Sequence, residues 1–422
     1  PEIARIRGMR TAPFPVFVSF VLVFPLVGLG LVVGGVLANR RRVRLLRDGE
    51  RALPAMWTAI EAAREEILLE MYWVGDDAVG RRFRDALRRA AQRGVRVLVI
   101  YDSVGSLGLP ETFFQPVEEA GGHVHEYHPL SPLRPSFDLD RLEERDHRKL
   151  LVTDSARGFT GGVNLARPWS PEREGGEGWR DDVIEVVGHA ARELRTLFYK
   201  TWRRVHRAGL RGAADMAKRA LLTHQVRPDL RPRDLVTLPR RPTSPVYVLA
   251  SQRRSKRSIG REYLGRVRSA TRSIEIANSY FLPDRGVRHG LYRAVARGVR
   301  VRVLVPERSD VAVVQYATEA LFDELLRKGV EVYAMPGPMM HAKTAVIDDA
   351  FATIGSYNLD ARSRQNLEVN VAVEDPAFAR HVRSWFDHDV ASAKVIDLFE
   401  WRARSLTRRG AELAAYALRR LL

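Results

Sequence analysis

The chain has 422 residues, of which 45% are hydrophobic, and its formal net charge is +18. This length predicts two domains or a fused pair of similar halves, and the hydrophobic content excludes a disordered chain. The absence of cysteine excludes disulfides, thiolate zinc sites and cysteine nucleophiles. The positive charge predicts an anionic partner, either nucleic acid or a membrane rich in acidic lipid.

The first predicted element is a transmembrane helix over residues 16–38, a run that contains no charged residue. At about 1.5 Å per residue, this helix spans roughly 34 Å, which exceeds a hydrocarbon core of about 30 Å. A signal peptide has an apolar run of only about 7–15 residues, so we favour a retained anchor over a cleaved signal or a buried core helix. Arginines are denser after the run than before it, which favours a cytoplasmic catalytic region in a single-pass membrane protein.

After the anchor, short β-rich runs alternate with amphipathic helical runs, a pattern typical of an α/β fold. A helix, an Arg-Gly stop and a Val-rich strand occur at residues 86–102 and again at residues 291–307. Gly94 and Gly298 stand where a left-handed helix terminus favours glycine. The repeated block indicates that the chain contains two similar halves.

We therefore expect five segments in chain order. They are an N-terminal anchor at 1–48, a first half at 49–205, a basic Pro-rich linker at 206–245, a second half at 246–400, and a basic amphipathic helix at 401–422. In the last segment, leucines recur on one side and arginines recur eleven residues apart, which is three helical turns. Such a helix either lies in the headgroup region of a membrane or packs on the protein.

Each half closes with the same constellation of residues at the same spacing. The first half reads HRKLLVTDSARGFTGGVN and the second reads HAKTAVIDDAFATIGSYN. From each histidine, the lysine follows after two residues, the aspartate after seven and the asparagine after seventeen. The two sets are His147, Lys149, Asp154 and Asn164, and His341, Lys343, Asp348 and Asn358. A single His-x-Lys is most often a surface strand, but two matched copies indicate a site.

The residue types in this constellation suit chemistry at phosphorus. A histidine and a lysine two positions apart on a strand project from the same face. If the halves pack around a pseudo-two-fold axis, two imidazoles face each other across a phosphate held by two ammonium groups and two amides. One imidazole then attacks phosphorus, and the other, protonated, gives a proton to the departing alkoxide. Lysine is rare here, with only seven residues in the chain, yet both motifs carry it.

At these motifs the chain resembles the phospholipase D superfamily, which is defined by paired H-x-K-x4-D motifs. Within it, the chain is more similar to bacterial cardiolipin synthases than to nucleases. The resemblance extends over about residues 50–422 and includes RDHRKLLV, GWRDDVIEVVG and MHAKTAVIDDAFATIGSYN. It implies two phospholipase D-like α/β/α sandwich halves related by a pseudo-two-fold axis.

The resemblance also implies roles for individual residues. The superfamily's catalytic set falls on His147, Lys149, Asn164, His341, Lys343 and Asn358. By the same comparison, His147 is the expected nucleophile and His341 the general acid. Asp154 and Asp348 complete the motifs and are expected to be mainly structural.

Acidic residues that orient the two imidazoles are the remaining part of the site that the resemblance implies. By position, these orienting residues are Asp181 and Glu368, with Asp182 as an alternative to the former. We expect no cofactor and no metal. His123, His125 and His128 have a spacing that suggests metal ligands, but no carboxylate pattern completes such a site.

The predicted activity is that of a cardiolipin synthase-like phosphatidyltransferase, acting through a covalent phosphohistidine. Its predicted partners are a membrane bilayer and an anionic phospholipid substrate such as phosphatidylglycerol, without nucleic acid. The first alternative is a phospholipase D that uses water as acceptor, because the same residues serve both reactions. The second is a nuclease of the same superfamily, which the basic surface would suit.

Overall fold

The computed structural model describes residues 43–130, 144–217, 242–251 and 258–419, with the backbone alone over 207–217. Residues 43–422 form one compact unit. The transmembrane helix expected at 16–38 lies outside the described residues. Among the helices within them, none combines the length and the apolar character that crossing a bilayer requires.

The first half is built on a seven-stranded sheet with the order β1-β7-β6-β5-β2-β3-β4. Strands β2, β3 and β4 run parallel, and the other neighbours are antiparallel. The sheet begins before residue 49, the expected start of this half. Its strands are β1 (Val43–Arg47), β2 (Glu66–Met71), β3 (Arg96–Asp102), β4 (His123–Tyr127), β5 (Lys149–Thr153), β6 (Arg157–Gly161) and β7 (Asp182–Val187).

The second half is built on an eight-stranded sheet with the order β15-β11-β10-β9-β12-β13-β14-β8. Here β9, β10 and β11 are the parallel strands. The strands are β8 (Val246–Ser251), β9 (Ser273–Asn278), β10 (Arg300–Pro306), β11 (Glu331–Met335), β12 (Lys343–Ile347), β13 (Phe351–Gly355), β14 (Glu368–Val373) and β15 (Lys394–Val395).

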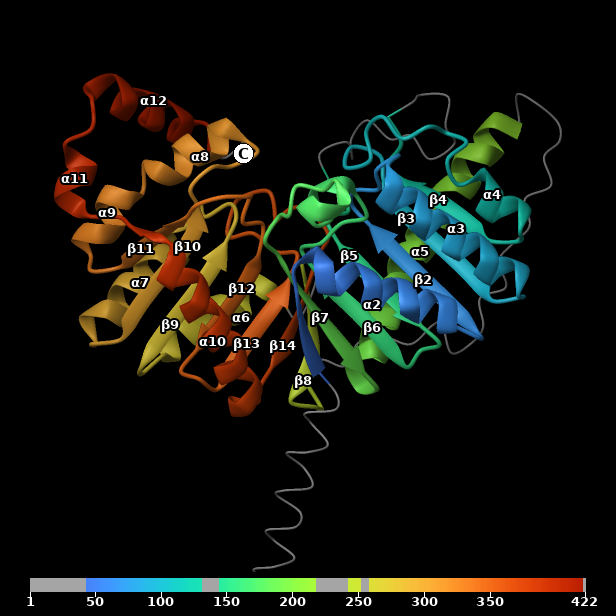
Figure 1. Ribbon diagram of the computed structural model, residues 1–422, viewed down its shortest axis with the longest axis horizontal. Coiled ribbons are helices and arrows are strands. Elements are labelled where there is room, and N and C mark those ends of the chain that lie inside the picture. The colour runs from blue at the N-terminus through green and yellow to red at the C-terminus, as the bar shows by residue number, and fades with distance from the viewer. Residues whose placement is uncertain (1–42, 131–143, 218–241, 252–257, 420–422) are drawn as a thin grey trace, which may run out of the picture. The chain divides into compact units, whose positions relative to one another are not determined.

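The two sheets correspond strand by strand. Read from β4 and from β11, each has three parallel strands, then the two strands of the motif hairpin, then two antiparallel strands. β15 is an addition to the second sheet. Figure 1 shows the two sheets side by side, the first in blue to green and the second in yellow to red. The prediction of two similar α/β halves is therefore confirmed.

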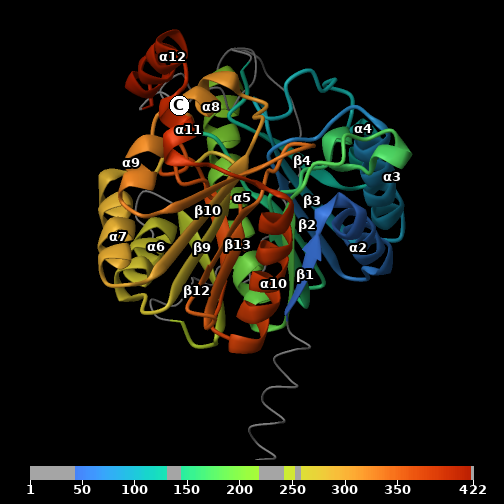
Figure 2. The same ribbon diagram turned by 60° about the vertical axis from the view of Figure 1, so that its left-hand side comes forward.

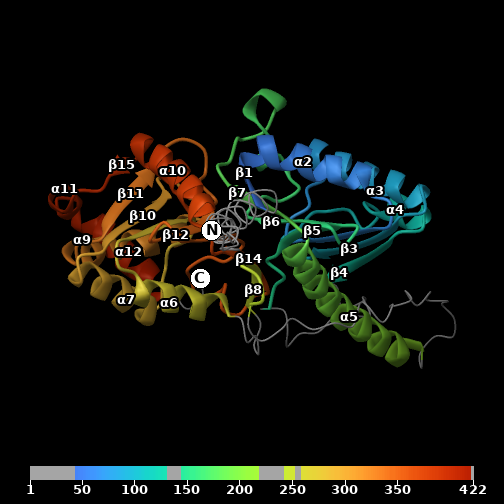
Figure 3. The same ribbon diagram turned by 90° about the horizontal axis from the view of Figure 1, so that it is seen from below.

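Helices cover both faces of each sheet. Figure 3 shows α2 and α3 on one face of the first sheet with α5 on the other, and α6 and α7 on one face of the second sheet with α10 on the other. The helices of the first half are α2 (Asp48–Ala62), α3 (Ala78–Gln92), α4 (Gln115–Glu119) and α5 (His189–Ala217). Those of the second half are α6 (Ile259–Ser269), α7 (Arg285–Ala296), α8 (Ala312–Glu319), α9 (Phe322–Arg327), α10 (Pro376–Ser392), α11 (Leu398–Arg402) and α12 (Leu406–Ala417).

Local sequence signals start and stop the repeated helices. The Asp77 side chain accepts hydrogen bonds from the first turn of α3, and Asp284 does the same for α7. Past their C-termini, Gly94 and Gly298 have φ values of +83° and +86°, as their positions predicted. The two halves share one apolar core, in which Leu150 and Val152 of β5 cluster with strand residues of the second sheet.

The C-terminal helix packs on the protein through one face only. Figure 2 shows α12 beside α8, and Arg408 of α12 pairs with Glu319 of α8. Ala415 is buried there. The opposite face stays open to solvent: Leu406 is 81% exposed and Leu413 is 65% exposed.

Candidate active site

The two His-x-Lys motifs occupy corresponding places in the two sheets. Each lysine is the first residue of its strand, Lys149 in β5 and Lys343 in β12, and each histidine lies two residues earlier. The residue between them faces the other side: Arg148 is fully buried and donates to Glu70 and Thr201. The alternation of a strand thus directs imidazole and ammonium to one side in both halves.

Backbone pairing ties each histidine to the opposite half. The His147 N–H donates to the carbonyl of Leu367 at 3.0 Å, and the His341 N–H donates to the carbonyl of Arg180 at 2.7 Å. Short bridges join Asp146 to Leu367 and Arg180 to Met340. The same contact therefore occurs twice with the halves exchanged, as a pseudo-two-fold relation requires.

Each histidine side chain also contacts an acid that belongs to the opposite half. His147 Nδ1 lies 3.0 and 3.1 Å from the two carboxyl oxygens of Glu368, which belongs to the second half. His341 Nδ1 lies 2.8 Å from Asp181 Oδ2, which belongs to the first half. Because Nδ1 of each ring faces an acid, Nε2 is left to face the site. Asp182 contacts neither ring and instead accepts from Thr344 and pairs with Arg180.

The residue fifteen positions after each histidine contacts one of the two acids, and it differs between the halves. In the first half this residue is Gly162, and a Cβ there would lie 2.1 Å from Asp181 Oδ1. In the second half it is Ser356, whose hydroxyl donates to Glu368. A glycine thus lets the shorter acid approach closely, and a serine stabilises the longer one. Both acids are fully buried.

Both lysines are buried beside aromatic rings. Lys149 Nζ donates to the His147 carbonyl at 2.8 Å and lies 4.7 Å from the ring centroid of Tyr72. Lys343 Nζ donates to the His341 carbonyl and to Ser279 Oγ, the latter at 2.9 Å. Burial lowers the pKa of Lys149 to about 7 and that of Lys343 to about 8. An anion bound between them would restore the positive charge of both.

The side-chain oxygens of the two asparagines accept hydrogen bonds from residues that follow β2 and β9. Asn164 Oδ1 accepts from the Trp73 N–H at 3.1 Å. Asn358 Oδ1 accepts from Ser279 Oγ at 2.9 Å. Both side chains are buried. Since their oxygens are occupied, their amide N–H groups are the part that can donate to a ligand.

The charges of the two motifs act on each other. Burial, then Lys149, Lys343 and His341, hold the pKa of His147 well below its usual value. Burial and Lys343 also lower the pKa of His341, against the opposing effect of Asp181. Because the lysine of each motif affects the histidine of the other, the two histidines and the two lysines lie within one electrostatic site.

The pKa values of Glu368 and Asp181 are shifted in opposite directions. Burial raises the pKa of Glu368 to about 8, an effect that Lys149 and Ser356 only partly offset. Burial also opposes the ionisation of Asp181, but His341 and the hydrogen bond from Trp169 outweigh it, so the pKa of Asp181 is lowered. The site is therefore symmetric in geometry and asymmetric in charge.

The motif aspartates lie away from the imidazoles and bind backbone. The Asp154 carboxylate accepts from the N–H groups of residues 64, 65 and 66 at 2.8 to 3.2 Å. The Asp348 carboxylate accepts from those of residues 271, 272 and 273 at 2.7 to 3.2 Å. Each therefore joins the start of a parallel strand, β2 or β9, to the turn after the motif strand.

We expect Asp154→Asn and Asp348→Asn to cost stability rather than chemistry. Hydrogen bonds to a charged group are each worth about 1.5–3 kcal/mol, and an amide cannot accept from all three donors. Either variant should lower the free energy of unfolding by at least this amount while the folded enzyme keeps its turnover rate. Thermal unfolding and an activity assay well below the midpoint test this. Lost activity at an unchanged midpoint would assign the carboxylates to the reaction itself.

Several side chains of the site were not predicted as site residues. The Tyr72 ring meets the His147 ring edge-on at 4.7 Å between centroids, and Trp169 meets His341 in the same way at 5.3 Å. Ser279 joins Lys343 to Asn358. The signal for Tyr72 and Ser279 was their place directly after the matched strands β2 and β9. Trp169 ends a short 3-10 helix (Arg167–Trp169) between β6 and β7 and offered no such signal.

Among the described residues, no three His, Asp or Glu side chains gather as a metal site would require. Each histidine contacts its acid and an aromatic ring, and both lysines act on its charge. This arrangement suits a two-sided attack on a phosphodiester, in which one ring bonds to phosphorus and the other transfers a proton.

Comparison with known proteins agrees with this geometry. The family model described as "Cardiolipin synthase, PLD-like domain" matches residues 56–176 and 263–390, one segment in each half. "Cardiolipin synthase A" of Pseudomonas entomophila is 33% identical over 365 residues, covering 85% of this chain and 70% of that protein. "Major cardiolipin synthase ClsA" of Bacillus subtilis is 32% identical, covering 86% and 72%.

Among solved structures, phosphatidylserine synthase of Haemophilus influenzae aligns with a TM-score of 0.66 at 13% identity, covering 90% of this chain and 96% of that one. Polyphosphate kinase of Porphyromonas gingivalis aligns with a TM-score of 0.53 at 14% identity, covering 85% and 49%. These two likenesses concern the fold alone.

The fold and the paired motifs define an enzyme of the phospholipase D superfamily. Within that superfamily, the chain belongs to the cardiolipin synthase family of phospholipase D-like proteins, and it is a phosphatidyltransferase.

Proposed function

We propose that this enzyme transfers a phosphatidyl group from one phospholipid, phosphatidylglycerol or a similar donor, to a hydroxyl of a second, and so forms cardiolipin. Its relatives at 30 to 33% identity that are named cardiolipin synthases support this substrate class. The observation that carries the proposal is the crossed pair of imidazoles, each with Nδ1 on a buried acid of the opposite half.

The proposed reaction has two steps. In the first, His147 Nε2 attacks phosphorus, the bond from phosphorus to the headgroup oxygen breaks, and protonated His341 gives its proton to that oxygen. In the second, the acceptor hydroxyl returns a proton to His341, its oxygen attacks phosphorus, and the phosphorus–nitrogen bond breaks. Both lysines and both asparagines hold the phosphate oxygens throughout. Each of the six residues proposed as catalytic from the sequence thus takes part in this reaction.

The charge asymmetry of the acids supports this assignment of the two histidines. Although burial and Lys343 lower the pKa of His341, ionised Asp181 opposes them and favours the protonated ring that a general acid needs. His147 has its pKa held well below the usual value, so it is neutral near pH 7. A neutral ring whose Nδ1–H is accepted by ionised Glu368 presents its Nε2 lone pair to phosphorus, as a nucleophile needs.

Product analysis with the purified enzyme tests the proposal. Labelled phosphatidylglycerol in vesicles should yield labelled cardiolipin and free glycerol. Phosphatidic acid as the sole product would instead identify a hydrolase, and cleavage of DNA at comparable efficiency would identify a nuclease. Expression of the enzyme in a host that lacks cardiolipin repeats the test in a cell. Cardiolipin should then reappear in the lipids of that host.

We also propose that the catalytic region contacts the membrane through α11 and α12. Phe399 is 84% exposed, and it accompanies the exposed Leu406 and Leu413 on these helices. Large apolar side chains at such exposure, together with the exposed Arg409, suit the boundary of an anionic bilayer. This contact would add to the anchor expected at 16–38, whose flanking arginines favour a catalytic region on the cytoplasmic side.

A chain that starts at residue 43, the beginning of the compact unit, separates this contact from the anchor. We expect it to sediment with phosphatidylglycerol vesicles, and Leu406→Glu or Leu413→Glu to weaken sedimentation several-fold. Leu107→Glu is the matched control, because Leu107 is 76% exposed but belongs to the first half. Equal sedimentation of all three variants would refute the contact.

A further inference from the structure

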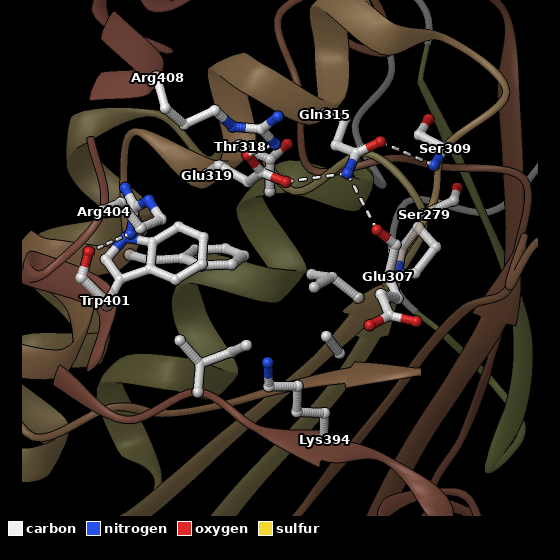
Figure 4. A pocket seen from close by; sticks show the side chains of 15 residues that line it. Ser279, Glu307, Ser309, Gln315, Thr318, Glu319, Lys394, Trp401, Arg404 and Arg408 are labelled. Carbon is white, nitrogen blue, oxygen red and sulfur yellow. Dashed lines mark hydrogen bonds and ion pairs between the residues drawn. The ribbon is translucent and has the colours of Figure 1, made fainter. Parts of the chain in front are cut away.

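A cavity of about 260 Å³ lies in the second half, at the carboxyl ends of its parallel strands. Its walls come from the ends of β10 and β11, from α8 and α9, and from α11 and the start of α12. Figure 4 shows Glu307, Gln315, Lys394 and Trp401 around the open space. In α/β folds, ligands bind at this edge of a sheet.

The cavity adjoins the catalytic motif directly. Ser279, which follows β9, is part of its wall. The Ser279 hydroxyl accepts from Lys343 Nζ at 2.9 Å and donates to Asn358 Oδ1 at 2.9 Å. One hydrogen bond therefore separates the cavity wall from two motif residues of the half that carries His341.

The cavity wall combines apolar side chains with five charged ones, of which two, the exposed Glu307 and Lys394, are not paired in the part of the chain that the structure describes. Pro306, Phe322, Ile396 and Trp401 supply apolar surface. Within the described residues, neither the Glu307 carboxylate nor the Lys394 ammonium has a hydrogen-bond or ion-pair partner. Lys394 is also one of only seven lysines in the chain.

The other charged groups of the wall are neutralised in place. Arg408 pairs with Glu319, and Arg404 pairs with Glu412 while stacking on Trp401 at 3.3 Å. The cavity thus offers a single acceptor and a single donor of full charge. This balance disfavours a ligand with net charge and favours hydroxyl groups, which both donate and accept.

The Glu307 side of the cavity is held in place by a side-chain brace. Gln315 Nε2 donates to the Glu307 carbonyl and to Glu319 Oε1, both at 2.9 Å. Gln315 Oε1 accepts from the Ser309 N–H at 3.2 Å. Since every polar atom of this amide is engaged, Gln315 positions the loop that carries Glu307.

We propose that this cavity binds the polyol headgroup of the alcohol that reacts at the His341 side, a glycerol-type group. The inference rests on the proposed function, because it places the alcohol beside the proton-transferring histidine. Its volume is below the roughly 300–1,000 Å³ of sites that enclose drug-sized ligands, so it suits a small headgroup with the acyl chains outside. α11 and α12, which complete the wall, follow α10 and have no counterpart in the described first half.

A competition between acceptors tests the inference. The enzyme with all 422 residues receives a phosphatidyl donor with a 4-nitrophenyl leaving group, together with equal concentrations of glycerol and 1-propanol. Nitrophenol release reports donor cleavage, and the ratio of phosphatidylglycerol to phosphatidylpropanol reports acceptor choice. We expect glycerol to be preferred, and E307Q or K394M each to lower that ratio about 2- to 10-fold, the effect of one lost hydrogen bond.

The controls separate this inference from the proposed function. K328M removes an exposed lysine of the same half that is not part of the cavity wall and should leave the product ratio unchanged. If phosphatidic acid is the only product, the proposed transfer fails. If transfer proceeds but E307Q and K394M keep the wild-type ratio, the cavity inference fails. If ethanolamine outcompetes glycerol and E307Q removes that preference, the cavity is an amine site and the polyol inference is overturned.

Discussion

Replacing His147 with alanine should abolish formation of the phosphatidyl-enzyme with every donor, whereas replacing His341 should do so only with donors whose leaving group needs a proton. With a 4-nitrophenyl donor, His341→Ala should still release nitrophenol once per site and then stop. The reason is that nitrophenolate departs without an acid, but the acceptor hydroxyl in the second step still lacks its base. General acid–base catalysis is worth about 10²- to 10⁴-fold, which sets the expected loss with a natural donor.

The phosphohistidine itself gives the second readout. After exposure to a 4-nitrophenyl donor labelled in its phosphate, His341→Ala should retain label on His147, and His147→Ala should retain none. His289→Ala, which removes an exposed histidine, is the matched control and should behave as wild type. Label on His341 in the His147 variant would reverse the two roles, and turnover of either variant at the wild-type rate would exclude the mechanism.

Neutralising either buried acid should lower the rate of the step that its histidine serves. Asp181→Asn removes the charge that stabilises protonated His341, so turnover of a natural donor should fall by about 10²- to 10⁴-fold. The initial release of nitrophenol from the 4-nitrophenyl donor should fall much less, because His341 need not act as an acid in that first step. Glu368→Gln should slow nitrophenol release itself, because it acts through His147. Asp85→Asn, which removes the partly exposed carboxylate paired with Arg84 on α3, should have no effect.

The raised pKa of Glu368, about 8, gives this prediction a pH dependence. Below pH 8 the pair of Glu368 and His147 keeps an extra proton, and the pair releases it as pH rises through this value. Only then does a carboxylate accept from Nδ1–H and leave Nε2 unprotonated. With a saturating 4-nitrophenyl donor, which needs no proton from His341, the rate of the first step should therefore rise with pH up to about 8, and Glu368→Gln should remove this rise. A flat wild-type profile would contradict the role of Glu368.

Much of the fold could be predicted because its signals are local or repeated. The strand alternation, the aspartate and glycine signals at helix ends, and the block at residues 86–102 and 291–307 each lie within one stretch of chain. The correspondence of the two sheets follows from that repetition. By contrast, β1 comes directly after the expected anchor and has no repeated signal of its own, so its place in the first sheet was not predicted.

The sequence likewise predicted some features of the candidate site and not others. Regular spacing marked the two histidines, lysines, asparagines and aspartates as matched sets, and their catalytic roles remain predictions. The resemblance pointed to Asp181 and Glu368 but not to which ring each one faces. His147 and Glu368 are 221 residues apart in sequence, so no local pattern encodes their contact.

By itself, the sequence determined that the chain is a duplicated α/β protein with two matched His-x-Lys motifs, because spacing and periodicity are properties of the chain. Only the tertiary structure decided that each imidazole is held by the acid of the other half, that Tyr72 and Trp169 enclose the rings, and that α11 and α12 complete a cavity beside Lys343. These contacts arise when surfaces distant in sequence are buried together. Burial also makes Glu368 and Asp181 titrate differently, which no reading of residue types could show.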